Sequence, residues 1–377
     1  MNDAAMQTTP LWPDASAEDA GFDPGRLAEA VTLAETSETE WPRDMYVDGR
    51  FVGSVHVNDR PPYDRPMGPV VPRGGPAGLV LRGGRIVARW GDPGRQDMTF
   101  SIAKSYLAIL TGVAVDMGLI GSIDEPVGQR VDDGGFEGPH NGAVTWRHLL
   151  EQTSEWHGTL FERPDSVDWN RKAGSEVPSV TGNADKGTVR ELQAPGTHFE
   201  YNDVRVNRLA LSLLRVFRRP LPDVLAEHVL EPMGVTGGWA WHGYDTSWVE
   251  VDGRRMQSVP GGGHWGGGLV IDSHVHARVG ELVLHRGHFH GRKILSPDWV
   301  DAMLTPSALE PTYGLLWWLN TDGRLLPGAP ETSVFAMGGG SNIIWVDRPR
   351  DLVVVVRWMH KPVTNDFVGL VTRAMTG

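Results

Sequence analysis

The residues best suited to chemistry are Ser101 and Lys104, in the segment Ser101-Ile102-Ala103-Lys104. They lie where an apolar strand-like run gives way to an apolar helical one. Residues three positions apart on a helix share a face, with Cβ atoms about 5–6 Å apart. At that distance an unprotonated lysine amine can accept the serine proton and convert the hydroxyl into a good nucleophile. Because this short pattern is common, the surrounding motifs must show whether the pair is catalytic.

Such a pair needs a second proton-transferring group and donors that stabilise an oxyanion. Tyr201 is a candidate for the first, because it ends a turn-forming segment that leads into a predicted helix over residues 204–217. The glycine run 338–340, between two predicted strands, is a candidate for the second. Glycine lets the backbone approach a ligand closely and leaves N–H groups free to face it. Taken alone, Tyr201 is more often a core tyrosine and a glycine run can be a strand bulge.

Composition limits the other classes of function. The 377 residues are many for one core, so one two-lobed domain or two domains are expected. A net charge of −12 argues against nucleic acids and anionic membranes as partners. The absence of cysteine excludes disulfides, thiol catalysis and zinc–thiolate sites. The first residues lack the pattern of a signal peptide, and no stretch is apolar enough to span a bilayer, so a cytoplasmic location is predicted.

The hydrophobic pattern predicts the elements that must position these groups. Apolar residues recur at helical spacing from 101 to 117, and Gly118 is suited to end that helix. Two apolar runs around residues 82–84 predict a β-hairpin. Further elements are helices over 17–38, 145–150, 205–217, 272–285 and 366–374, strands over 333–336, 342–346 and 352–358, and an irregular covering segment over about 50–76. We therefore predict an α+β protein with an antiparallel sheet from both chain ends, flanked by helices, and a mostly helical lobe over about 105–260.

Several motifs stand in a recognisable order along the chain. Ser-x-x-Lys at 101–104 precedes Thr-Trp-Arg-His-Leu-Leu at 145–150, and Pro-Gly-x-x-Phe-x-Tyr ends at Tyr201. A Gly-Gly-Gly-Leu turn at 266–269, Tyr-Gly-Leu-Leu-Trp-Trp at 313–318 and the late glycine run follow. Together they resemble the serine β-lactamase and penicillin-recognising superfamily. The spacing is most similar to its class C β-lactamase-related branch, with the family VIII carboxylesterases and 6-aminohexanoate-dimer hydrolases.

The resemblance implies a β-lactamase/transpeptidase-like serine hydrolase domain over 46–377, after an N-terminal extension and helix over 1–45. It implies that Ser101 is acylated, that Lys104 helps to deprotonate it, and that Tyr201 is the general base toward the serine and the general acid toward the leaving group. The oxyanion hole would combine the backbone amides of Ser101 and Gly339. The flanking residues Gly338 and Gly340 would contact the substrate. No metal or organic cofactor is implied.

Two positions depart from the family pattern. Its Tyr-x-Asn motif reads Tyr201-Asn202-Asp203, so a carboxylate replaces the carboxamide that touches the lysine and the substrate in relatives. If Asp203 reaches Lys104, it favours the ammonium form and leaves proton transfer to Tyr201. A shift of one residue would place Asn202 there instead.

The second departure is in the family's Lys-Thr-Gly motif, which reads Ala-Met-Gly at 336–338 and lacks a cation for a substrate carboxylate. This favours a small neutral or cationic ester or amide and weak or absent β-lactamase activity.

The sequence leaves the roles of the histidines open. His264 and Trp265 precede the glycine turn, and a substrate-binding role for them is as well supported as a structural one. The histidines around 285–290 lack a metal-binding signature, so no metal site is predicted.

The sequence also leaves open which molecule accepts the acyl group. If water discharges the acyl-enzyme, the protein is an esterase or amidase. If an amine or alcohol discharges it, the protein is an acyltransferase. A non-catalytic binding protein could keep the same fold. The sequence does not specify the oligomeric state.

Overall fold

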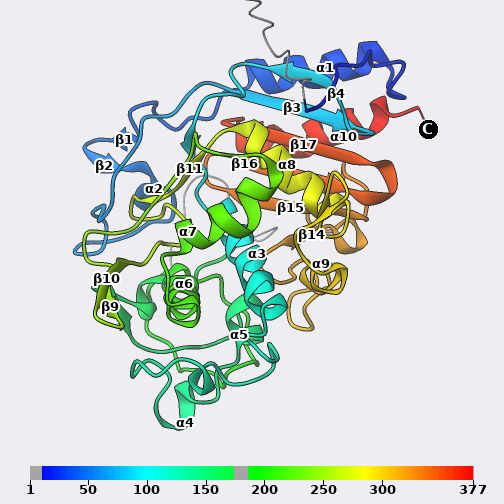
Figure 1. Cartoon of the computed structure of the whole chain (residues 1–377). Coiled ribbons are helices and arrows are strands. Elements are labelled where there is room, and N and C mark those ends of the chain that lie inside the picture. Colours follow the sequence, from blue (N-terminus) through cyan, green and yellow to red (C-terminus); the bar gives the residue numbers. More distant parts are fainter. Residues whose placement is uncertain (1–10, 174–185, 377) are drawn as a thin grey trace, which may run out of the picture.

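A six-stranded antiparallel sheet forms one lobe of the molecule in the computed structural model, which describes residues 11–173 and 186–376 (Figure 1). Strands from the two ends of the chain meet where β17 pairs with β3. The prediction of a single antiparallel sheet from both chain ends is therefore confirmed. In sheet order the strands are β14 (Trp318–Leu319), β15 (Ser333–Gly338), β16 (Asn342–Asp347), β17 (Leu352–Arg357), β3 (Ala77–Arg82) and β4 (Arg85–Trp90).

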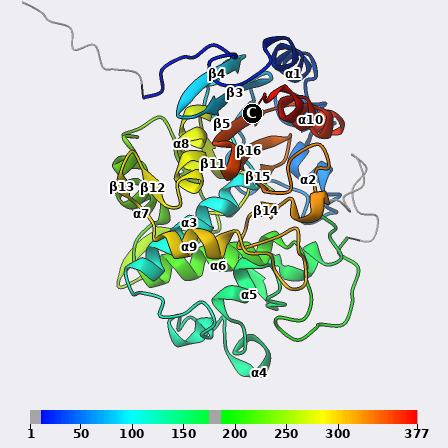
Figure 2. The same ribbon diagram turned by 90° about the vertical axis from the view of Figure 1, so that its right-hand side faces the viewer.

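Helices cover both faces of this sheet. Helices α1 (Pro24–Thr36) and α10 (Thr364–Ala374) lie side by side on one face (Figure 2). Helix α8 (Ser273–Leu284) and the start of α3 (Ile102–Asp116) pack against the other. The α8 contact is close, because a methyl group at Gly280 would lie 2.4 Å from Val353 Cγ1. Covering both faces explains why β17 reads as a continuous apolar run rather than an alternating one.

The first described helix begins later than its composition predicts. The helix expected over 17–38 is α1, which begins at Pro24 because Asp23 caps it, its side chain accepting from the Arg26 amide at 2.9 Å. The preceding residues run along the sheet, with Trp12 buried. Residues 11–45 are therefore packed against the sheet lobe. Residues 1–10 of the predicted N-terminal extension lie outside the described part of the chain.

The second lobe is built largely from the middle of the chain. Its helices are α4 (Gly138–Asn141), α5 (Trp146–Leu150), α6 (Asp203–Phe217) and α7 (Leu221–Leu225), with α9 (Pro297–Met303) beside α3. Short hairpins accompany them: β6 (Thr159–Leu160) with β7 (Arg163–Pro164), β9 (Trp248–Val251) with β10 (Arg254–Gln257), and β12 (His288–Phe289) with β13 (Arg292–Lys293). A three-stranded sheet joins β5 (Asp97–Met98), β11 (Gly268–Ile271) and β8 (Ala240–His242).

The segment predicted as an irregular cover is partly ordered. It is entered through β1 (Tyr46–Val47) and contains β2 (Arg50–Phe51) and the short helix α2 (Val52–His56). The segment over 313–318 forms a strand only at its end, where β14 begins at Trp318.

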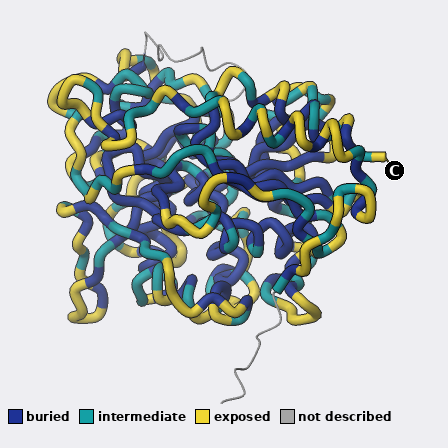
Figure 3. Tube along the Cα trace, turned by 90° about the horizontal axis from the view of Figure 1, so that it is seen from above, coloured by how far each residue is buried: buried dark blue, intermediate teal, exposed yellow. Residues whose placement is uncertain are grey.

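Helix α3 occupies the centre of the molecule. Buried chain fills the middle of Figure 3 and exposed chain lies mostly at the periphery. Every residue of α3 from Ile102 to Ala114 is buried, between strand β15 of the sheet and helix α6 of the second lobe. A lysine in the first turn of this helix is thus withdrawn from bulk water. In the described residues, no helix combines the length and apolarity needed to cross a membrane.

Candidate active site

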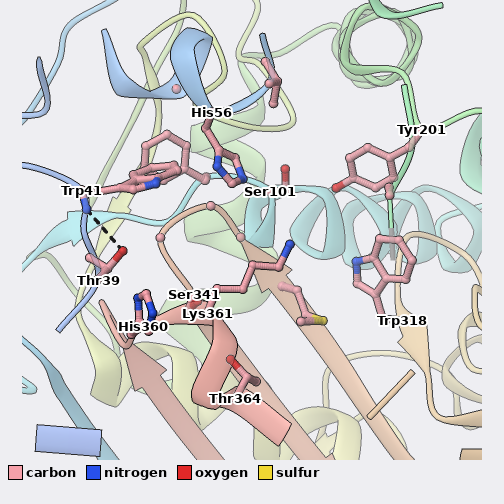
Figure 4. A pocket seen from close by; sticks show the side chains of 18 of the residues that line it. Thr39, Trp41, His56, Ser101, Tyr201, Trp318, Ser341, His360, Lys361 and Thr364 are labelled. Carbon is pink, nitrogen blue, oxygen red and sulfur yellow. Dashed lines mark hydrogen bonds between the residues drawn. The ribbon is translucent and has the colours of Figure 1, made fainter. Parts of the chain in front are cut away.

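Ser101 stands at the junction of the two lobes. Strand β5 ends at Met98, Phe100 takes a left-handed conformation with φ 51°, and Ser101 is the N-cap of α3. The hydroxyl opens into a cavity of about 340 Å³ (Figure 4). The unpaired N–H groups at the start of a helix carry partial positive charge, which favours negative charge developing there. The predicted nucleophile therefore lies in the cavity between the lobes.

Lys104 lies beneath Ser101, as the helical spacing predicts. Its Nζ atom is 2.9 Å from Ser101 Oγ and forms an ion pair with Asp203 Oδ1. The lysine is only 1% exposed. Its ammonium group also lies 4.8 Å from the centre of the Tyr201 ring, within the range of a cation–π contact. The structure thus brings Ser101, Lys104, Tyr201 and Asp203 together.

Tyr201 forms the opposite wall. It precedes α6, and its ring is stacked against Trp318 with centroids 5.6 Å apart. The guanidinium of Arg171 lies 5.0 Å from the ring centre. The phenolic hydroxyl points toward Ser101 across the cavity (Figure 4). Tyr201 is thus held by aromatic packing, with its hydroxyl directed toward the serine.

The glycine run at the end of β15 passes directly against the Ser101 turn. A methyl group at Gly338 would lie 2.1 Å from the Thr99 carbonyl oxygen and 3.2 Å from the Ser101 amide nitrogen. Gly340 has φ +72°, and side chains at Gly339 or Gly340 would collide with tryptophan rings. Only glycine permits this approach. All three glycines line the cavity, so the predicted close approach of backbone to the site is present.

Asp203 is held by three cationic side chains. Besides the Lys104 contact, its Oδ2 atom accepts from Arg171 and from His264 Nδ1, the latter at 2.7 Å. Burial alone would raise the pKa of Asp203, but the charges of Arg171 and Lys104 and the bond from His264 hold it well below its ordinary value. Asp203 does not line the cavity, and its predicted contact with substrate stays a prediction. Both of its oxygens bind protein groups instead.

Asn202 does not take that place either. Its side-chain oxygen accepts from the amides of Val204 and Arg205, which caps α6, and its nitrogen donates to the Asp165 carbonyl. Asn202 is fully buried and faces the helix start, and its predicted substrate contact stays a prediction. A one-residue shift of the motif is also excluded, since Asp203 is the residue that reaches Lys104.

His264 connects Asp203 to a second buried carboxylate. Its Nε2 atom is 2.7 Å from Asp59 Oδ2, while Nδ1 faces Asp203 at the same distance. Burial would raise the pKa of Asp59, but His264 and Lys186 hold it below its ordinary value. Since two ionised carboxylates can only accept hydrogen bonds, both ring nitrogens must donate. Both ring nitrogens of His264 are therefore engaged by carboxylate oxygens.

The same cluster contains two further charges and an aromatic support. Lys186 forms ion pairs with Asp59 and with Asp168, the second at 2.8 Å. Trp265 stacks on His264 with ring centroids 3.9 Å apart and donates its indole N–H to Asp59 at 2.9 Å. His264 lines the cavity and Trp265 does not, and the predicted substrate contact of each stays a prediction. The role of Trp265 is to position the histidine.

Among the described residues, one group could hold a metal ion by its geometry. The ligand atoms of Asp59, Asp168 and His264 lie within 4.8 Å of one another, and all three residues are buried. Lys186 already binds both carboxylates, and His264 is engaged through both nitrogens. A bound metal would have to displace that ammonium and break the contacts of the histidine with its two carboxylates. The residues fit an internally compensated charge cluster better than a metal site.

Several residues of the site were not predicted. Asp59 lies in the segment expected to be an irregular cover, and Arg171 and Lys186 carried no motif. Trp41 lines the cavity, as does Lys361. No signal along the chain marks these residues, because each comes from a loop or a helix start whose position depends on the completed fold.

Most of the sequence matches a known protein family. The family model described as Beta-lactamase matches residues 73–373, most of the chain, and the chain belongs to this family of hydrolases. A sequence relative is the 6-aminohexanoate-dimer hydrolase of Paenarthrobacter ureafaciens, 21% identical over 324 residues, which cover 74% of this chain and 70% of that protein.

Solved structures share the fold at low identity. One is EstCE1, described as a hydrolase with promiscuous acyltransferase activity: it is 15% identical with a TM-score of 0.58, over 94% of this chain and 99% of that one. Another is a family VIII carboxylesterase, 16% identical with a TM-score of 0.55, over 82% of this chain and 93% of that one. At such identities the likeness establishes the β-lactamase/transpeptidase-like α+β fold, and the chemistry must be argued from the site.

Proposed function

We propose that the chain is a serine hydrolase that cleaves a small ester or amide through an acyl-enzyme on Ser101. The observation that carries this proposal is the 2.9 Å contact between Ser101 Oγ and the buried Lys104 Nζ, at the edge of a cavity that Tyr201 faces from the other side. A serine beside a buried basic group is the arrangement that activates a hydroxyl. The curated relative and the two solved neighbours are described as hydrolases or an esterase, which agrees with this chemistry.

The reaction proceeds in two steps. Ser101 Oγ attacks the carbonyl carbon as its proton passes, with the help of Lys104, to the deprotonated Tyr201 oxygen, and the carbonyl oxygen becomes an oxyanion. The amides of Ser101 and Gly339 donate to that oxyanion, in keeping with the close approach of Gly338 to the Ser101 amide. Tyr201 protonates the departing alcohol or amine as the bond to carbon breaks. Water then attacks the acyl-enzyme and releases the acid and the free serine.

The charge cluster fixes Lys104 beneath Ser101. The Asp203 carboxylate that Lys104 contacts is shared with Arg171 and His264. Lys186 in turn binds the carboxylates of Asp59 and Asp168. We infer that these buried contacts hold the lysine amine 2.9 Å from the serine hydroxyl.

A second candidate is acyl transfer to an alcohol or amine. The cavity walls include Trp41, Phe100, Trp318, Leu325 and Met337, which are aromatic or aliphatic. Such walls can exclude water from an acyl-enzyme and bind an organic acceptor in its place. The structural neighbour EstCE1 is described as having this activity. Product analysis with added alcohol separates the two outcomes, because transfer yields a new ester in excess of the acid.

The test is intact-mass spectrometry after brief incubation with p-nitrophenyl butyrate or a fluorophosphonate. Wild type should gain one adduct on Ser101, Ser101→Ala should gain none, and Ser341→Ala, which changes another serine of the cavity wall, should behave as wild type. Tyr201→Phe should acylate about 10²-fold more slowly, because it lacks the proton-transferring hydroxyl. No adduct on wild type, or an equal adduct on Ser101→Ala, would refute the proposal and favour a binding protein.

A further inference from the structure

Trp41 forms one wall of the cavity and comes from a part of the chain that the family model does not match. That model begins at residue 73, whereas Trp41 and His56, which both line the cavity, precede it in sequence. Trp41 and Tyr201 lie on opposite sides of Ser101 (Figure 4). The N-terminal part of the chain therefore encloses the cavity on the side away from the tyrosine.

The indole of Trp41 is held in place by its neighbours. The backbone carbonyl of Trp41 accepts a hydrogen bond from Arg73 Nε at 2.7 Å, and Arg73 is buried. The half-buried ring packs against Phe100 in a T-shaped arrangement, with centroids 5.0 Å apart. It also touches the end of β15, because a methyl group at Gly339 would lie 2.6 Å from Trp41 Cη2. An anchored backbone and close packing leave the ring little room to move.

The wall at Trp41 presents uncharged rings to the cavity. His56 packs against the indole with ring centroids 5.1 Å apart. Burial, together with the positive charges of Lys361 and Arg171, lowers the pKa of His56 to about 4, so its imidazole is neutral near pH 7. Phe100 lines the cavity beside them. A surface of this kind suits an apolar group, because contact with it removes apolar area from water.

The proposed mechanism determines which part of the substrate meets this wall. In the tetrahedral intermediate, the reacting carbon carries four groups. The first is Ser101 Oγ, the second is the oxyanion at the amides of Ser101 and Gly339, and the third is the leaving group, which Tyr201 protonates. The acyl chain takes the remaining direction, away from the Tyr201 hydroxyl, and on that side the cavity ends at Trp41.

We propose that Trp41 limits the length of the acyl group, and that the natural substrate is an ester or amide of a short apolar acid. Behind the indole lies a buried apolar cluster that includes Phe51, Phe100 and Trp358. A short acyl chain ends against the indole, whereas a long one would have to displace the indole from this cluster. Removing the indole would open the cavity toward the cluster. This inference rests on the proposed hydrolase function.

The experiment varies the acyl group and the leaving group separately. p-Nitrophenyl butyrate and p-nitrophenyl octanoate differ only in the acyl chain, and phenyl acetate and 4-butylphenyl acetate differ only in the leaving group. Release of the phenol gives kcat/KM for wild type, Trp41→Ala and Trp41→Leu. Trp248→Ala, which removes an exposed tryptophan of β9 that does not line the cavity, is the control.

Wild type and Trp248→Ala should prefer the butyrate to the octanoate by about tenfold in kcat/KM. Trp41→Ala should lose or reverse that preference, because the longer chain enters the space that the indole leaves. Trp41→Leu keeps an apolar side chain in the packing, should weaken the preference by about threefold or more, and carries the test if Trp41→Ala does not fold. Equal use of both esters by wild type, or a preference that survives in every folded variant of Trp41, would overturn the proposal.

The two acetates test the side of the cavity to which Trp41 belongs. The variants of Trp41 should keep the ratio of kcat/KM for the two acetates within about twofold of the wild-type ratio, because these leaving groups extend toward Tyr201. A change in that ratio as large as the change in the acyl series would overturn the assignment of Trp41 to the acyl side.

A binding measurement separates failure of this inference from failure of the proposed function. Ser101→Ala removes the nucleophile, and butyrophenone and hexanophenone are ketones without a leaving group, so calorimetry with them reports affinity alone. Adding Trp41→Ala or, if that variant does not fold, Trp41→Leu should raise the affinity for hexanophenone relative to butyrophenone by about tenfold. That result would support the role of Trp41 even if wild type hydrolyses no ester and the hydrolase proposal fails. A relative affinity that the change at Trp41 leaves unaltered would overturn the inference, even if the Ser101 adduct forms as expected.

Discussion

The sheet core and the charge cluster behind Ser101 are both buried, but they are assembled by different rules. The core around β17 is made of apolar side chains on adjacent strands, each of which packs against near neighbours in the sheet. The charge cluster gathers Asp59, Lys104, Asp168, Lys186, Asp203 and His264 from separate segments. Apolar burial is non-directional and tolerates apolar substitutions that conserve volume. A buried charge requires its own partner at hydrogen-bond distance.

This contrast predicts that the cluster tolerates substitution less well than the core. Removing one charge leaves the opposite charge buried and unpaired, whereas removing a methyl group leaves only a small void. Substitutions in the charge cluster should therefore lower the free energy of unfolding more than substitutions in the apolar core. A change to acid pH should act on the cluster alone.

Asp59→Asn should destabilise the fold by about 3–5 kcal/mol, because Lys186 and His264 each lose a buried ionic partner. Urea unfolding followed by circular dichroism measures the loss. Asp14→Asn is the control, since it breaks an exposed pair with Arg89 and should cost at most about 1 kcal/mol. Equal losses in the two variants would contradict the distinction between the cluster and other ion pairs.

The cluster should also make stability depend on acid pH. Asp59 and Asp203 have pKa values in the folded protein below the ordinary value of about 3.9 that applies when unfolded. Their contribution is therefore present above about pH 4 and is lost as the pH falls through the folded-state values. Between about pH 5 and pH 3, wild type should lose more stability than Asp59→Asn, by on the order of 1 kcal/mol. Parallel pH profiles from urea titrations would argue against this assignment.

The core should respond to shape rather than charge. Gly280→Ala places a methyl group against Val353 and should destabilise the protein by about 1–3 kcal/mol. In the Val353→Ala background the same change should become stabilising, by about 0.5–1 kcal/mol, because alanine favours the helix once space exists. Thermal unfolding of the four proteins gives the sign. A loss of similar size in both backgrounds would show that backbone, not Val353, limits the approach of α8.

The sequence predicted elements where local pattern determines structure. The hairpin β3–β4, the strands β15 to β17 and the helices α3 and α8 follow from apolar periodicity and turn residues within each segment. The Ser101–Lys104 pair was predictable for the same reason, since three positions on a helix fix its geometry.

The remainder depends on contacts between distant segments. Asp59 follows a short helix in a segment rich in proline and glycine, and nothing beside it in sequence indicates that it binds His264, 205 residues away. Asn202 and Asp203 are adjacent, yet one caps a helix and the other binds Lys104, because the start of α6 turns them to different sides. Lys361 could not be assigned to the cavity until the place of the turn after β17 was known.

The meeting of β3 and β17 in one sheet also determines when the protein can fold. Val80 and Val354 are paired neighbours, yet most of the chain lies between them in sequence. At synthesis rates of about 5–20 residues per second, on the order of tens of seconds pass between the synthesis of β3 and that of its partner β17. During that time the hairpin exposes an unpaired edge, which is prone to aggregation. The architecture therefore allows the sheet to close only after β17 has been synthesised.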